Sequence, residues 1–160
     1  MNFAWWCSGL SNTNWTWSPE IYPGIWMLIA VFAFSYFRFI NPSIQNKQSA
    51  YFLIGIILFW IFTDWPVGPL GAGYLLSVHI LQYLVYTFIV APLLILSKSK
   101  NIYEKIFNTK FAILLKNLYL PFFIINFTLV ITHIPFIADN LKATQFGTMI
   151  IDLAWIFSAL

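Results

Sequence analysis

Few side chains in this sequence could do chemistry, and they lie in apolar stretches where polar groups are costly. The 160 residues include only two histidines, His79 and His133. Asp152 lies in a third apolar stretch. Imidazole and carboxylate groups together suit a transition metal or a proton relay, and buried ionisable groups in membranes usually mark function. We therefore treat His79, His133 and Asp152 as candidate metal ligands.

Three further residues could form a polar layer around these ligands. Gln82 and Tyr83 follow His79 at the third and fourth positions, so all three share one face of a helix. This polar stripe is expected to face the inside of a helix bundle, and Asp64 closes another apolar stretch nearby. The alternative for the same residues is hydrogen bonding between helices, without a metal.

The helices that position these residues follow from the composition. Apolar residues make up 61% of the chain and charged residues only 8%, whereas a soluble domain has about a quarter charged residues. The surface must therefore face lipid, and the fold class is an all-α, polytopic transmembrane bundle. No basic patch with spaced aromatic residues suggests binding to nucleic acid.

Four apolar stretches approach the length of about 20 residues that a membrane-crossing helix needs. They cover residues 21–40, 49–64, 74–96 and 117–137. Pro92 predicts a kink in the third. A fifth begins near Gly147 and is still apolar at Leu160, so we expect four full spans, an incomplete fifth, and a chain truncated at its C-terminus.

The basic residues predict the orientation. Arg38 and Lys47 flank the first connection, and the segment 97–116 carries five lysines, whereas the loop 64–73 has none and the loop 138–146 balances Lys142 with Asp139. The first connection, at residues 41–48, and the segment 97–116 are therefore predicted to be cytoplasmic, which places the N-terminus outside. His79 then lies about 7–8 Å, and His133 about 6 Å, below the outer ends of their helices.

The remaining segments are predicted to lie at the membrane surfaces. Residues 1–20 contain four tryptophans among small polar residues and read as an outer interfacial segment, with Cys7 as an interfacial thiol. Residues 101–116 form an amphipathic pattern typical of the inner surface. The run 68–73 lacks the Lys-Ser or Lys-Thr of a phosphate loop and predicts a tight turn. Residues 21–160 are then the transmembrane domain.

Three motifs together resemble the CtaG-type cytochrome c oxidase assembly family. The first motif begins at Asp64-Trp65-Pro66 and continues through His79 and Gln82 to Ala91-Pro92-Leu93-Leu94. The family typically shows His-Met-x-Gln-His at the position of His79 and Gln82, followed by Ala-Pro-Pro-Leu-Leu in the same helix. Thr132-His133-Ile134-Pro135 is similar to the family's Trp-His-x-Pro. A helix resembling His-x-x-Glu-His follows, and here it reads Met149-Ile150-Ile151-Asp152-Leu153.

The resemblance implies a bacterial plasma-membrane protein with about seven helices that helps to build haem–copper oxidases by delivering copper at the periplasmic face. It implies that His79 and His133 handle copper. Tyr83 replaces the second histidine of the first motif, and Met149 and Leu153 replace both histidines of the last.

We therefore weigh an assembly factor with copper as its cargo against a non-catalytic subunit bound to a respiratory oxidase. Both have membrane lipid and oxidase subunits as partners. A transporter fits less well, because the titratable groups lie near one face and not at the midplane. Nothing pairs a nucleophile with a base, so no enzyme is predicted.

Overall fold

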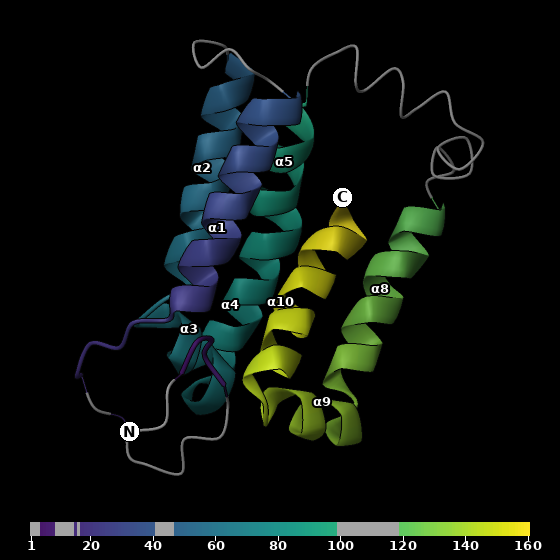
Figure 1. Ribbon diagram of the computed structural model, residues 1–160. Coiled ribbons are helices and arrows are strands. Elements are labelled where there is room, and N and C mark those ends of the chain that lie inside the picture. The colour runs from purple at the N-terminus through teal and green to yellow at the C-terminus, as the bar shows by residue number, and fades with distance from the viewer. Residues whose placement is uncertain (1–3, 9–14, 16, 41–46, 99–118) are drawn as a thin grey trace.

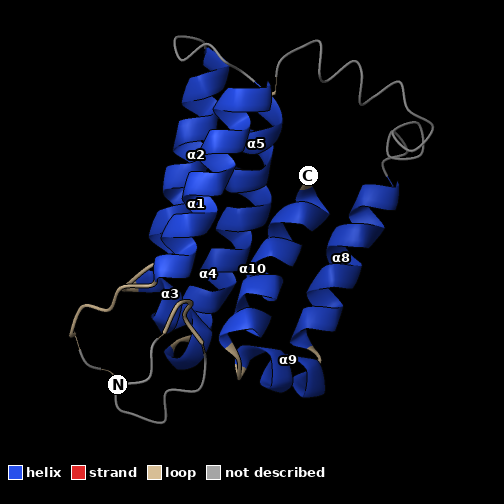
Figure 2. Cartoon of the chain, viewed as in Figure 1, coloured by secondary structure: helices blue, strands red, loops and turns tan. Residues whose placement is uncertain are grey.

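The structure, a computed structural model, describes residues 4–8, 15, 17–40, 47–98 and 119–160 (Figure 1). Over these residues every regular element is helical, which confirms the all-α prediction (Figure 2). The elements are α1 (Pro23–Ser35), η1 (Tyr36–Ile40), α2 (Lys47–Thr63), α3 (Val67–Pro69), η2 (Leu70–Tyr74), α4 (Leu76–Val85), η3 (Tyr86–Val90), α5 (Ala91–Leu96), α8 (Tyr119–His133), α9 (Pro135–Lys142) and α10 (Gln145–Ala159).

Two continuous helices are long and apolar enough to cross a membrane. They are Pro23–Ile40, which joins α1 to η1, and Leu76–Leu96, which joins α4, η3 and α5. Two more spans result if each bent pair counts as one: α2 with Val67–Tyr74, bent by 60°, and α8 with α9, bent by 74°. The described residues therefore hold two to four candidate spans, and α10 is a shorter apolar helix.

Parts of two predicted loops are helical instead. Within the predicted loop 64–73 the chain forms α3 and η2, and α9 takes up residues 138–142 of the predicted loop 138–146. Helical turns give backbone groups internal partners, which an open loop at membrane depth lacks. A side chain at Gly68 would meet the carbonyl oxygen of Thr63 at 2.0 Å, so only glycine lets α3 fold back this closely on the end of α2.

Two prolines alter the spans in different ways. The fourth predicted span was expected to reach residue 137, but α8 ends at His133. Ile134 has an extended backbone with ψ of 124°, the conformation that a following proline favours, and Pro135 then starts α9. At Pro92, where the sequence predicted a kink, Leu76–Leu96 is one continuous helix, and the π-helical turn η3 ends just before Ala91 and Pro92.

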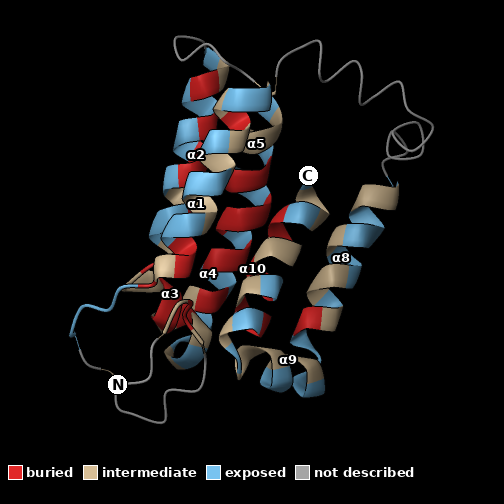
Figure 3. Cartoon of the chain, viewed as in Figure 1, coloured by how far each residue is buried: buried red, intermediate tan, exposed pale blue. Residues whose placement is uncertain are grey.

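Buried residues lie on the helix faces that meet inside the bundle, and exposed residues lie on its outside (Figure 3). Among the described residues, ten of the buried ones are polar or charged, and many of the exposed ones are large and apolar. α10 packs against η3 and α5 on one side and against α8 on the other, while α9 lies across the ends of α8 and α10 (Figure 1). The buried polar residues are Ser49, Thr63, Asp64, His79, Gln82, Thr87, Ser97, Thr132, Thr148 and Asp152. Most sit on the helices around α10, which therefore positions the candidate site.

The two segments predicted to lie at the membrane surfaces are residues 1–20 and 101–116, and the structure describes only part of the first. Trp6 and Cys7 lie in the main core cluster, with 0% and 2% of their surface exposed. This part of the predicted interfacial segment therefore packs into the bundle, whereas Trp17 is 70% exposed. The amphipathic segment predicted at 101–116 lies outside the described residues.

Candidate functional site

The two histidines come together at one end of the bundle. His79 lies in the first turn of α4 and is buried, and His133 is the last residue of α8 and is exposed. Their ring centroids are 5.5 Å apart. Two imidazoles from separate helices, 54 positions apart in sequence, thus lie next to each other.

The hydrogen bonds of His133 leave one ring nitrogen able to bind a ligand. Its Nδ1 lies 2.8 Å from the carbonyl oxygen of Leu129. A carbonyl only accepts, so Nδ1 carries the hydrogen and Nε2 keeps its lone pair. Histidines that bind metals commonly donate their second ring N–H to a backbone carbonyl in this way.

Trp155 of α10 holds both imidazoles in place. Its ring lies 4.9 Å from that of His79 and stacks at 18° on that of His133, with centroids 6.2 Å apart. Its Nε1 donates to Thr132 Oγ1 at 3.1 Å, and Tyr83 packs on it edge-on at 5.5 Å. Tyr83 therefore supports Trp155 from the same polar stripe as His79.

Asp152 lies on the inner side of the site. It is 5% exposed, and its Oδ2 accepts a hydrogen bond from Trp6 Nε1 at 3.1 Å. Asp152, His79 and Cys7 line one narrow cavity of about 10 Å³, room for about one water molecule. Within the described part of the chain, no three histidine, cysteine or acidic side chains are grouped closely enough to hold a metal ion. The arrangement offers a pair of imidazoles, not a complete coordination shell.

Gln82 also lines this narrow cavity. As the spacing predicted, it is buried together with His79 and Tyr83. Its Nε2 donates to the carbonyl oxygen of Phe62 at 2.6 Å. A side chain at Gly71 would meet Gln82 Oε1 at 1.8 Å, so any larger residue there would displace the Gln82 amide.

Asp64 has a different environment. Its Oδ2 accepts from Trp26 Nε1 at 2.9 Å and Trp60 Nε1 at 2.7 Å, and its Oδ1 accepts from the Trp65 amide at 2.9 Å. Both oxygens are engaged, and Asp64 does not line the cavity beside His79. It ties the start of α1 to the end of α2.

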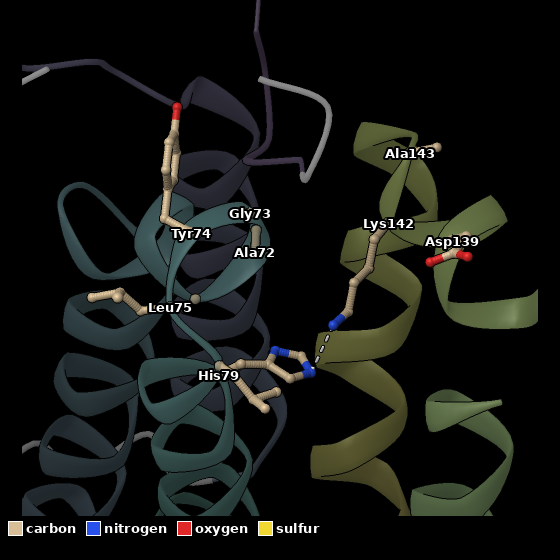
Figure 4. A pocket seen from close by; sticks show the side chains of 10 residues that line it. Ala72, Gly73, Tyr74, Leu75, His79, Asp139, Lys142 and Ala143 are labelled. Atoms are coloured by element: carbon tan, nitrogen blue, oxygen red, sulfur yellow. Dashed lines mark hydrogen bonds between the residues drawn. The ribbon is translucent and has the colours of Figure 1, made fainter. Parts of the chain in front are cut away.

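Besides Trp6 and Trp155, sequence reasoning missed Lys142 and Cys7 as neighbours of the site. Lys142 Nζ lies 2.9 Å from His79 Nε2 (Figure 4). Its signal in the sequence was a lysine in a loop predicted to face outward, where basic residues are scarce. Cys7 lies against the carbonyl oxygen of Thr63 at 3.7 Å; burial first, and then the charge of Asp152, raises the pKa of its thiol. No local pattern placed Cys7 inside the bundle.

The comparison with protein families decides the assignment. A family model described as the cytochrome c oxidase caa3 assembly factor (Caa3_CtaG) matches residues 29–160. The chain belongs to this family. No curated protein and no solved structure matches the chain.

Membership in Caa3_CtaG confirms the resemblance drawn from the three motifs, and the match covers the helices that carry His79, His133 and Asp152. The protein is a multi-pass membrane protein of a family assigned to the assembly of caa3-type cytochrome c oxidase. Such an assembly factor associates with the oxidase and has no expected catalytic role of its own.

Proposed function

We propose that this protein binds copper as cargo at the outer face of a bacterial plasma membrane and passes it to a caa3-type oxidase during assembly. The observation that carries the proposal is the imidazole pair of His79 and His133, with ring centroids 5.5 Å apart. Imidazole suits copper well. A pair of donors binds a metal less tightly than a full set of ligands, which suits an ion that must leave again.

The proposed orientation has the N-terminus outside. Arg38 lies in η1, Lys47 begins α2 and Lys98 follows α5, all at the end of the bundle opposite α9 and the start of α4 (Figure 1). Basic residues favour the cytoplasmic side. The end with His79 and His133 then faces outward, where an oxidase being assembled could accept copper. Four spans, with each bent pair counted as one, fit this alternation.

The test is the copper content of the oxidase in cells. His79→Ala and His133→Ala variants are expressed in cells that lack the native gene, and the oxidase is purified and assayed for copper and activity. We expect either variant to reduce both to the level of the deletion. Asp64→Asn is the matched control, because it keeps an acceptor oxygen for the tryptophans outside the site, and it should retain both. Normal copper content with either histidine variant would overturn the proposal.

A second candidate is a non-catalytic protein that stays bound to the oxidase. The observation that favours it is the absence of a three-ligand group among the described residues. Mild-detergent purification separates the two: a permanent subunit would remain in equal amount with the mature oxidase, whereas an assembly factor would be enriched only with incompletely assembled subunits.

A further inference from the structure

The ring nitrogen of His79 that would bind a cation already has a partner. Lys142 Nζ lies 2.9 Å from His79 Nε2 (Figure 4). An ammonium group has only donors, so Nε2 accepts and its lone pair points at Lys142. His133, in contrast, makes its hydrogen bond through Nδ1. Of the two imidazoles, only that of His79 has its Nε2 covered by a positive charge.

The contact between His79 and Lys142 separates two hollows. The outer pocket, of about 480 Å³, is bordered by residues 71–76, Asp139 and Ala143 (Figure 4). The inner cavity of about 10 Å³ reaches Cys7 and Asp152. His79 and Lys142 line both, so they stand between the outer pocket and the buried groups.

Lys142 is placed where it can move without disturbing the core. It ends α9, a helix with no buried residue, which follows the 74° bend after His133. Asp139 precedes Lys142 by three positions, so the two share one face of α9. Asp139 also lines the outer pocket. A lysine that leaves His79 therefore has an acceptor of opposite charge within reach, on its own helix and on the outer side.

From this arrangement we propose that Lys142 is a removable plug for the cargo site: an incoming cation displaces its ammonium from His79 Nε2, and Lys142 turns toward Asp139. This inference rests on the proposed function and adds a specificity-determining residue to it. Only a cation with strong affinity for imidazole can displace the ammonium. Hard cations such as Mg²⁺ and Ca²⁺, which prefer oxygen ligands, are excluded.

The first test measures silver(I) binding to the full chain in detergent, because silver(I) resembles copper(I) and does not change its oxidation state under these conditions. Lys142→Leu removes the competing donor without adding a metal ligand, and it should tighten binding about tenfold or more, the effect of removing one charge-assisted hydrogen bond. Asp139→Asn should weaken binding about two- to threefold, because the displaced lysine loses its acceptor. Lys47→Leu, at the other end of the bundle, should bind like the wild type.

A second readout needs no metal. Diethylpyrocarbonate modifies uncharged imidazole, and peptide mass spectrometry distinguishes the two histidines. In the wild type we expect His133 to react faster than His79, and in Lys142→Leu we expect His79 to accelerate several-fold. Lys142→Gln, which keeps a polar side chain, serves as a second variant if the leucine variant folds poorly.

The possible outcomes distinguish a failure of the Lys142 proposal from a failure of the proposed copper-binding function. Silver bound equally by wild type and Lys142→Leu, with unchanged modification of His79, would overturn the plug and leave the proposed function standing. No silver binding by any of these proteins would overturn the proposed function and the plug with it. Tighter silver binding together with faster modification of His79 supports both.

Discussion

Asp64 and Asp152 are two buried carboxylates at the same end of the bundle, and their surroundings differ. Three N–H groups donate to the two oxygens of Asp64, all from tryptophans. Asp152 receives one tryptophan N–H, from Trp6, and lines a cavity with His79 and Cys7. A fully satisfied carboxylate serves the structure, whereas one that faces a cavity is free to serve a ligand. Burial does not distinguish the two carboxylates; the number of N–H groups that donate to each one does.

The largest stability effect should come from Asp64→Ala. It leaves the donors of Trp26, Trp60 and Trp65 without their acceptor, and the free energy of unfolding should fall by about 3 kcal/mol. Unfolding with SDS in mixed micelles, followed by tryptophan fluorescence, measures this loss.

The matched variant is Asp152→Ala, which removes an acceptor from one donor, Trp6, and should cost about 1 kcal/mol. Equal losses for the two alanine variants would break the contrast between a structural carboxylate and one that faces the cavity.

Gly71→Ala tests how tightly Gln82 packs in the cavity that it lines together with Asp152. The new methyl group would lie 1.8 Å from Gln82 Oε1, so the amide must leave its bond to the Phe62 carbonyl. We expect a loss of about 1–2 kcal/mol in the same unfolding assay.

Gly55→Ala is the control for this substitution, because its added carbon would lie 3.4 Å from Leu93, an ordinary contact, and stability should hardly change. If Gly71→Ala behaved like Gly55→Ala, the narrow cavity would not be as tightly packed as described.

The smallest effect concerns the reactivity of Cys7. The thiolate is the reactive form, and burial together with Asp152 raises the pKa of this thiol. N-ethylmaleimide should therefore label the folded protein at pH 7 at least about tenfold more slowly than the SDS-unfolded protein. Labelling of the folded protein should accelerate only at a pH above the pKa of an exposed cysteine. Equally fast labelling of both forms would place Cys7 outside the core.

Periodic patterns in the sequence predicted the helices and the polar stripe well. The spacing of His79, Gln82 and Tyr83 placed them on one buried face, because three and four positions bring residues to the same side of a helix. The breaks were harder to predict, since the turn at Gly68 depends on its approach to Thr63, a contact that hydropathy does not reveal.

The composition of the site could be predicted only in part. The histidines stood out because imidazole is rare in apolar helices. Trp6, Trp155 and Lys142 did not, because tryptophan and lysine are ordinary at membrane interfaces. Trp6 meets Asp152 across 146 positions and Lys142 meets His79 across 63. Such pairings arise from the packing of whole helices, and no local spacing encodes them.

The central claim is that His79 and His133 together hold a copper ion. Competition between the purified protein and a chromophoric copper(I) chelator tests it most directly. The account predicts one copper per chain in the wild type and in Asp64→Asn, and an affinity at least about tenfold lower in His79→Ala and in His133→Ala, the loss of one good ligand. Wild-type affinity in both histidine variants would contradict it.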